Sequence, residues 1–106
     1  MTAQTPQPPY YAVIFTSNRT PVEKGYSEMA NKMVVLAKYQ PGFLGVESAR
    51  EEIGITVSYW KDLKSIKDWK ENIEHINAQK KGKNEWYQNY KTRIAKVERD
   101  YEFIKK

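Results

Sequence analysis

The side chains best able to do chemistry gather in residues 55–79, which read ITVSYWKDLKSIKDWKENIEHINAQ. This stretch holds two of the three tryptophans, Trp60 and Trp69, and the only histidine, His75. An imidazole titrates near neutral pH, so His75 is the natural candidate for a general base. The sequence also leaves a plainer interpretation of His75 open, as a solvated or hydrogen-bonded surface residue.

The residue types exclude other chemistry. The chain has no cysteine, so it has no thiolate nucleophile, no disulfide and no thiolate metal site. A single histidine argues against a zinc or non-haem iron site, because such sites usually gather two or more imidazoles. We therefore expect no metal.

The elements that position these residues can be read from the spacing of apolar side chains. Residues 53–60 alternate as in a strand, with one face made of Ile53, Ile55, Val57 and Tyr59 and the other of Thr56, Ser58 and Trp60. Asp62 then caps a helix. Its apolar stripe is Leu63, Ile66, Trp69, Ile73 and Ile76. Trp69 is thus on the buried side, as core or as the wall of a pocket.

His75 does not share that stripe. At about 100° per residue it lies roughly opposite Ile66 on a straight helix. It faces inward only if the helix breaks near Asn72, or if a partner subunit covers it.

The remaining chain supplies three more strands and one more helix. Residues 1–9 contain three prolines and are expected to form a disordered or loosely docked tail. A strand over 10–16 ends in the polar residues 17–19, and residues 20–23 fit a capping box, although Gly25 moves the helix start toward Tyr26. The stripe of this helix is Tyr26, Met29, Ala30, Met33, Leu36 and Ala37.

After Pro41 and Gly42 the sequence predicts a strand over 43–50. Trp86 and Tyr90 are four residues apart and are expected to pair on a last helical turn. Residues 91–103 then have strand character, with Ala95, Val97 and Tyr101 on one face.

The order strand, helix, strand, strand, helix, strand predicts one α+β domain over residues 10–106. Two successive strand–helix–strand units give the ferredoxin-like split βαβ fold, a four-stranded antiparallel sheet with both helices on one face. The other face is then uncovered and apolar, which marks an interaction surface. We expect a homodimer.

The charge and hydropathy of the chain limit which binding partners and which cellular location are expected. The net charge of +5 comes from residues 79–106, which hold nine basic and four acidic side chains, because residues 1–78 balance at nine each. No nucleic-acid motif accompanies this surplus, so we expect no nucleic-acid binding. No apolar run suits a membrane span or signal peptide, and the expected location is the cytoplasm.

Four segments resemble the antibiotic biosynthesis monooxygenase domain family, in its small stand-alone bacterial form. They are YYAVIFTSNRT, QPGFLGVES, ITVSYWKDLKSIKDWKENIEH and WYQNYKTRIAKVERDYEF, which together span about residues 10–103. The resemblance implies a dimeric α/β barrel with a pocket between sheet and helices in each subunit. It also implies oxygenase chemistry without metal or flavin, in which a deprotonated phenol or hydroquinone reacts directly with O₂.

A related branch of that family degrades haem with an asparagine, a tryptophan and a histidine. Asn18 stands where the resemblance puts the asparagine, and Trp69 matches the tryptophan through the WKxxxxxxDW spacing from Trp60. The ligating histidine does not carry over, because that position holds Gln79 and His75 comes one helical turn earlier. Haem is therefore disfavoured, and no cofactor is expected.

Two hypotheses follow from the resemblance. In the first, the protein is a cofactor-independent monooxygenase whose catalytic candidates are Asn18, Trp69 and His75. Its substrate-binding candidates are Arg19, Tyr26, Trp60 and Trp86. In the second, the same pocket serves a non-catalytic ligand-binding or stress-response dimer. Asn18 and Arg19 also have a purely structural interpretation, as side chains that satisfy backbone groups at the end of a strand.

Overall fold

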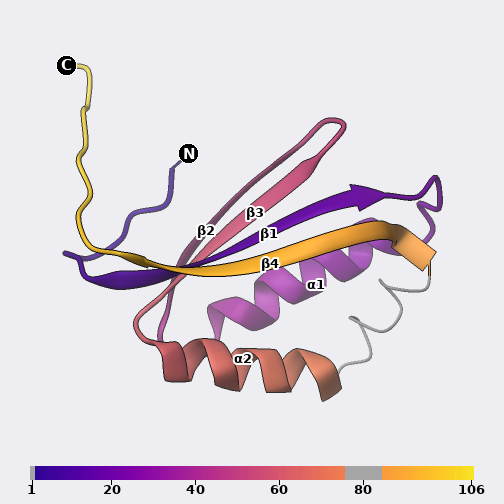
Figure 1. Cartoon of the computed structure of the whole chain (residues 1–106), viewed down its shortest axis with the longest axis horizontal. Coiled ribbons are helices and arrows are strands. Elements are labelled where there is room, and N and C mark those ends of the chain that lie inside the picture. The colour runs from indigo at the N-terminus through magenta and orange to yellow at the C-terminus, as the bar shows by residue number, and fades with distance from the viewer. Residues whose placement is uncertain (1, 76–84) are drawn as a thin grey trace.

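The computed structural model describes residues 2–75 and 85–106, without the side chains of residues 74 and 75. Its elements follow the predicted order: β1 (Tyr10–Arg19), α1 (Tyr26–Lys38), β2 (Phe43–Arg50), β3 (Gly54–Trp60), α2 (Leu63–His75) and β4 (Tyr87–Val97). The strands form one antiparallel sheet in the order β2-β3-β1-β4, and both helices lie on the same side of it (Figure 1). The predicted ferredoxin-like α+β fold is confirmed.

Helix α1 begins where its glycine permits, not at the predicted capping box. Gly25 has φ of 80°, a left-handed conformation that costs glycine little, and the helix starts at the next residue. The Thr20 hydroxyl does not cap a helix; it accepts from the Val22 N–H at 3.3 Å and donates to the Glu85 carbonyl. The capping-box prediction is therefore wrong, because Thr20 ties the end of β1 to the segment before β4.

Helix α2 begins as predicted. The Asp62 carboxylate accepts the Ser65 N–H at 2.8 Å and the Ser65 hydroxyl at 2.7 Å, which satisfies a donor of the first turn. Ile66 is buried, but Leu63 is 54% exposed, so its predicted place in the core is wrong. Leu63 lies about 120° from Trp69 around the helix, at the edge of the apolar stripe.

The last strand differs most from the expectation. β4 starts at Tyr87 and ends at Val97, so Trp86 and Tyr90 do not share a helical turn and the strand does not reach residue 103. β1 also extends through Arg19, three residues beyond the predicted end. Both corrections have one cause, because the two strands pair along their whole length from Tyr10↔Val97 to Arg19↔Tyr87. Backbone pairing overrides the local aromatic spacing.

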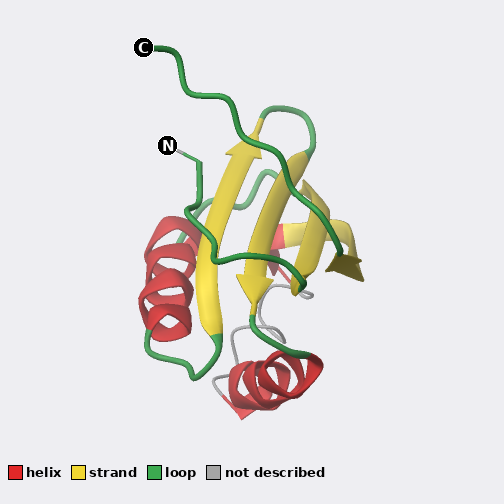
Figure 2. Cartoon of the chain, turned by 90° about the vertical axis from the view of Figure 1, so that its left-hand side faces the viewer, coloured by secondary structure: helices red, strands yellow, loops and turns green. Residues whose placement is uncertain are grey.

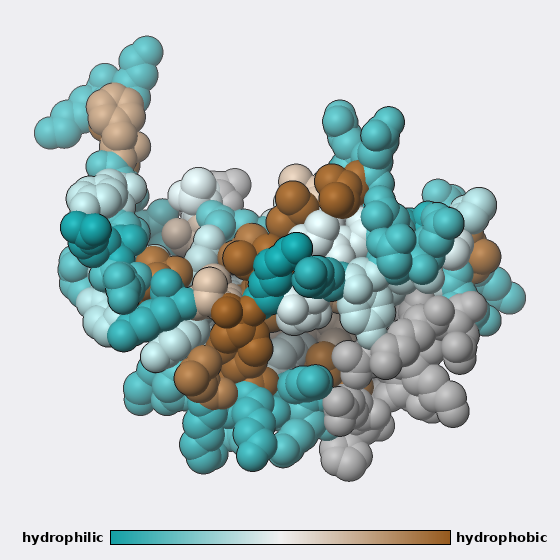
Figure 3. Space-filling model, viewed as in Figure 1, coloured by the Kyte–Doolittle hydropathy of each residue, from teal (hydrophilic) through white to brown (hydrophobic). Residues whose placement is uncertain are grey.

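Residues 98–106 have no regular structure, and Tyr101 is 87% exposed. The N-terminal tail is held on the sheet by the Ala3 N–H, which donates to Glu47 Oε2 at 2.8 Å. The Tyr10 hydroxyl donates to Asp100 Oδ2 at 2.6 Å. Both tails rise on the side away from the helices (Figures 1 and 2), and the C-terminal tail stands clear of the body (Figure 3).

Candidate functional site

The face of the sheet toward the helices is identified by the tryptophans. Trp60 of β3 stacks on Trp69 of α2, with ring centroids 6.0 Å apart and 28° between the planes. Trp60 is paired with Tyr11, and side chains directly opposite each other in an antiparallel pair share a face. Since side chains alternate along a strand, the odd-numbered residues of β1 face the helices. Phe15, Ser17 and Arg19 are among them.

At one end of this face lies a packed aromatic group. Trp60 is fully buried and meets Phe43 edge to face at 5.4 Å, while its indole N–H donates to the Ser58 hydroxyl at 2.9 Å. Trp69 completes the stack from α2 and is half-buried. These contacts are those of a core, with its polar atom already satisfied.

At the other end lies a second group, the aromatic cluster, which is made of Phe15, Tyr26, Trp86, Tyr87 and Tyr90. Phe15 contacts Tyr87 and Tyr90 at centroid distances of 5.5 and 5.2 Å. Tyr26, from α1, contacts Trp86 at 5.8 Å and Tyr87 at 6.0 Å, both edge to face. The cluster therefore joins β1, α1 and β4 and carries three phenolic hydroxyl groups.

Two arginines lie beside the aromatic cluster. The Arg19 guanidinium sits 3.6 Å from the centre of the Tyr26 ring, a cation–π contact. Its Nη2 donates to the Val22 carbonyl at 2.8 Å, and its Nε is buried without a hydrogen-bond partner in the described structure. Arg50 reaches across the sheet from β2, and its Nη2 donates to the Ser17 hydroxyl.

Gly54 makes this reach across the sheet sterically possible. It lies between the two partners, since Arg50 pairs with Gly54 across β2 and β3 and Ser17 pairs with Gly54 across β3 and β1. A Cβ at Gly54 would overlap the Arg50 guanidinium. Ser17 is only 1% exposed, so the hydrogen bond from Arg50 satisfies a buried hydroxyl.

The electrostatics of the cluster are those of a desolvated phenol near positive charge. Burial raises the pKa of Tyr87 well above its ordinary value, and the neighbouring Tyr26 hydroxyl raises it further. The guanidinium groups of Arg50 and Arg19 act in the opposite direction. Within residues 2–73 and 85–106 the only side-chain ion pair is Lys64–Asp68, so neither arginine is paired with a described carboxylate.

The structure thus places the predicted site residues in different parts of the sheet. It brings Arg19, Tyr26 and Trp86 together in or beside the aromatic cluster. Trp60 and Trp69 belong to the other group, since the Tyr11 and Arg19 positions are eight residues apart on β1, about 26 Å. Trp86 is 3% exposed and its indole N–H donates to the Lys24 carbonyl at 3.0 Å, so it packs at the base of the cluster.

Asn18 does not accompany Trp69. Its Nδ2 donates to Asn89 Oδ1 of β4 at 2.9 Å, and the alternation of β1 puts it on the face opposite Ser17 and Arg19. The prediction that Asn18 and Trp69 line one cavity is therefore wrong within a single subunit. The side chain of His75 and all of Gln79 lie outside the described residues, so the predictions for them stand as made.

Arg50, Ser17 and Tyr87 were missed from the sequence. The odd-numbered alternation of Phe15, Ser17 and Arg19 is a usable signal, but the predicted strand over residues 10–16 contains only the first of the three. Tyr87 falls between Trp86 and Tyr90, within the residues predicted to form a last helical turn. Arg50 carried no local signal, because its role depends on a neighbouring strand that presents a glycine to it.

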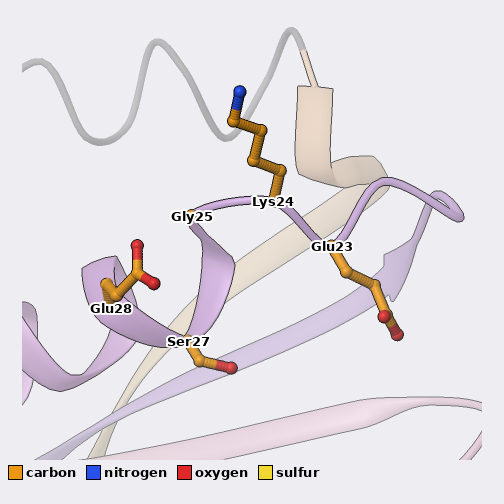
Figure 4. A pocket seen from close by; sticks show the side chains of 5 residues that line it. All are labelled: Glu23, Lys24, Gly25, Ser27 and Glu28. Atoms are coloured by element: carbon orange, nitrogen blue, oxygen red, sulfur yellow. The ribbon is translucent and has the colours of Figure 1, made fainter.

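A separate hollow lies at the start of α1, lined by Glu23, Lys24, Gly25, Ser27 and Glu28. Figure 4 shows these side chains diverging, with Lys24 and Glu23 on opposite sides of the chain. The hollow has no aromatic wall and no converging polar groups, so it offers a ligand little to bind. In the described part of the chain, no three His, Cys, Asp or Glu side chains are grouped to hold a metal ion. No described helix is long and apolar enough to cross a membrane.

Comparison with solved structures places this architecture among known folds. The protein PA3566 of Pseudomonas aeruginosa superposes with a TM-score of 0.68 and 17% identity, over 90% of this chain and 98% of that one. A Nitrosomonas europaea protein named "Putative antibiotic biosynthesis monooxygenase" gives 0.67 and 12%, over 87% and 92%. A Chloroflexus aurantiacus protein of the same name gives 0.54 and 16%, over 81% and 92%. At these identities the likeness shows the fold alone.

The chain is thus a ferredoxin-like α+β protein with an aromatic cluster, flanked by two arginines, on the face of its sheet toward the helices. By sequence it is 52% identical over 99 residues to the uncharacterized protein YqjZ of Bacillus subtilis (strain 168), across 92% of this chain and 87% of that protein. The chain belongs to the same family as YqjZ. No protein-family model matches it.

Proposed function

We propose that the protein is a monooxygenase that oxidises a small phenol or hydroquinone with O₂ and uses no metal or flavin. The observation that carries the proposal is the aromatic cluster, in which Phe15, Tyr26, Tyr87 and Tyr90 are only half-buried and lie beside the Arg19 guanidinium. The likeness in fold to two proteins that are each named "putative antibiotic biosynthesis monooxygenase" agrees with it.

The proposed reaction begins with removal of the phenolic proton. A phenol that loses its proton becomes an electron-rich phenolate, which can pass an electron to O₂ and then bond to the reduced oxygen at a ring carbon. Loss of water from the resulting hydroperoxide leaves a carbonyl, so one oxygen atom enters the product and the other leaves as water. All four electrons come from the substrate, and no further reductant is needed.

Arg19 is suited to the anionic stages of this sequence. Its guanidinium is always charged, and its Nε is buried with no partner among the described groups. The guanidinium has no described carboxylate as partner, so its charge can stabilise an oxyanion that forms beside it. Preorganised donors of this kind stabilise charge as it develops.

The proton acceptor is assigned less directly. Tyr87 is poorly suited, because burial raises its pKa and keeps the phenol neutral. His75 at the end of α2 is retained as the proposed general base, on its residue type alone. Asn18 and Trp69 are not proposed as catalytic residues of the same subunit. Asn18 lies on the face of the sheet opposite Arg19. Trp69 lies with Trp60 at the end of the sheet far from the aromatic cluster.

The test is incubation with ¹⁸O₂ across a panel of phenols and hydroquinones, followed by mass spectrometry of the product. We expect one labelled oxygen atom in the product with the wild type, and at least about tenfold slower turnover with Arg19→Gln. The matched control is Arg99→Gln, an exposed residue in the C-terminal tail. Oxygen consumption that yields hydrogen peroxide without label in the product would contradict the proposal.

The alternative is a ligand-binding protein without turnover. It is favoured by the apolar character of the cluster, which resembles binding sites in general. Saturable quenching of tryptophan fluorescence by these compounds, with no oxygen consumed, would establish it in place of the monooxygenase.

A further inference from the structure

Arg50 and Gly54 together place a positive charge over the sheet, and the proposed oxidation of a simple phenol does not require that charge. Four residues lie in register across the sheet on the face toward the helices: Arg50 of β2, Gly54 of β3, Ser17 of β1 and Tyr90 of β4. The second position has no side chain, so the first can lay its guanidinium over the sheet. A positive charge is thereby carried from an outer strand to the edge of the aromatic cluster.

The charge is held there without neutralisation. The Arg50 guanidinium donates from one nitrogen, Nη2, to the neutral Ser17 hydroxyl. No described carboxylate lies within ion-pair distance of it. A guanidinium has five N–H donors in a planar fork that matches a carboxylate, so most of its donor capacity is left for another partner.

The second arginine converges on the same place. Arg19 lies two residues beyond Ser17 on the same face of β1, about 7 Å along the strand. Both guanidinium groups also act electrostatically on the Tyr87 hydroxyl, which agrees with their place on the same face of the sheet. Like charges gathered beside a buried phenol are unfavourable unless an anion joins them.

We propose that Arg50, held over Gly54 against Ser17, binds the carboxylate of an aromatic acid whose ring lies in the aromatic cluster. This inference rests on the proposed function, because it takes the cluster to be the substrate site. It narrows the substrate class from phenols in general to phenols that carry a carboxylate. Arg50 is then a specificity residue, and Gly54 is a positioning residue that acts through it.

The experiment compares two probes of nearly equal shape, 4-hydroxybenzoate and its neutral analogue 4-hydroxybenzamide. Their affinities are measured by calorimetry under nitrogen, so that binding is read without turnover. We expect the acid to bind the wild type at least about tenfold more tightly than the amide, and this ratio to fall with added salt.

Variants assign the preference to its residues. Arg50→Gln should bring the ratio of the two affinities close to one, and Arg50→Lys should restore only part of it, because an ammonium lacks the bidentate fork. Gly54→Ala keeps every charge but displaces the guanidinium, so it should also reduce the ratio. Arg99→Gln should leave it unchanged. Urea unfolding midpoints, measured for each variant, separate loss of binding from loss of folding.

The outcomes are distinct. Equal affinity for acid and amide, no measurable affinity for either, or a preference that survives Arg50→Gln in the folded protein would overturn this inference. A preference for the acid that depends on Arg50, found in a protein that consumes no oxygen, would leave the inference standing and overturn the monooxygenase.

Discussion

Tyr87 shows how the surroundings of one residue set its chemistry. Its folded-state pKa lies above the ordinary value of 10.0, chiefly because the hydroxyl is desolvated. The folded protein therefore holds the phenolic proton more tightly than the unfolded chain does. This contribution to the free energy of unfolding is fully present below pH 10 and is lost as the pH rises above it.

We expect Tyr87→Phe to lose less stability than the wild type when the pH is raised from about 9 to about 11, because the variant has no buried phenol to ionise. Urea unfolding at several pH values measures this. Burial is the main cause that raises the pKa of Tyr59 to about 12, so ionisation of Tyr59 should also lower the stability of the folded protein as the pH rises. The control is Tyr101→Phe, since Tyr101 is 87% exposed. Parallel pH profiles for Tyr87→Phe and the wild type would contradict the assignment.

Trp69 leads to a different expectation from the one its sequence position suggested. It stacks on the fully buried Trp60, far along the sheet from Arg19, so Trp69→Phe should lower stability by about 1 kcal/mol and change ligand affinity less than about twofold. Trp60→Ala should cost about 3–5 kcal/mol. Both are measured by urea unfolding. A large loss of ligand affinity in folded Trp69→Phe would mean that the ligand lies at the tryptophan end.

At the scale of elements, the sequence correctly predicts a helix or strand where its local signals agree with its packing in the structure. The stripe of α1 is confirmed, with Tyr26, Met33 and Ala37 half-buried or buried and Val35 53% exposed. β3 is confirmed as a strand with Trp60 buried, but it begins at Gly54, and Ile53 and Ile55 are 46% and 43% exposed. The sequence-based prediction was wrong at β4 and at the end of β1, because those limits are set by pairing between residues about 70 to 90 positions apart in the chain. Such pairing has no signature in either strand alone.

The start of α2 offers a test of one local signal. Asp62→Ala should lower the urea midpoint more than Asp68→Ala, because Asp62 accepts two hydrogen bonds from Ser65 whereas Asp68 pairs only with the 82% exposed Lys64. The Ser65 hydrogen bonds lower the pKa of Asp62. Its contribution is therefore present above pH 3.8 and is lost as the pH falls through the folded-state pKa, so the difference between the variants should shrink there. Equal midpoints at neutral pH would show that the cap contributes nothing.

At the scale of the whole molecule, the candidate site was only half predictable. Arg19, Tyr26 and Trp86 were predicted as substrate-binding residues through the family resemblance, as charged and aromatic side chains around a flat substrate. Arg50 and Gly54 become partners of Ser17 only through the order β2-β3-β1, which brings three segments into one row. A site assembled across strands is a property of the topology, and residue types alone do not disclose it.

The same topology leaves one face of the sheet without helices, and this is the basis of the last prediction. The even-numbered residues of β1 share that face with Val57 of β3, which is paired with Ile14. Apolar side chains in such a position favour a second copy of the sheet as cover. We expect light scattering at micromolar concentration to give roughly 25 kDa, twice the 12.5 kDa of the chain, with on the order of 800 Å² buried per subunit.

Val57→Arg should return the protein to 12.5 kDa while its circular dichroism remains that of the folded chain, because a charge in the centre of the face cannot be desolvated without a partner. The matched control is Val35→Arg, on the exposed side of α1, which should remain a dimer. A wild type that is monomeric at these concentrations would exclude the barrel assembly. Dissociation by Val35→Arg but not by Val57→Arg would instead place the interface on α1 and leave the open face of the sheet to another partner.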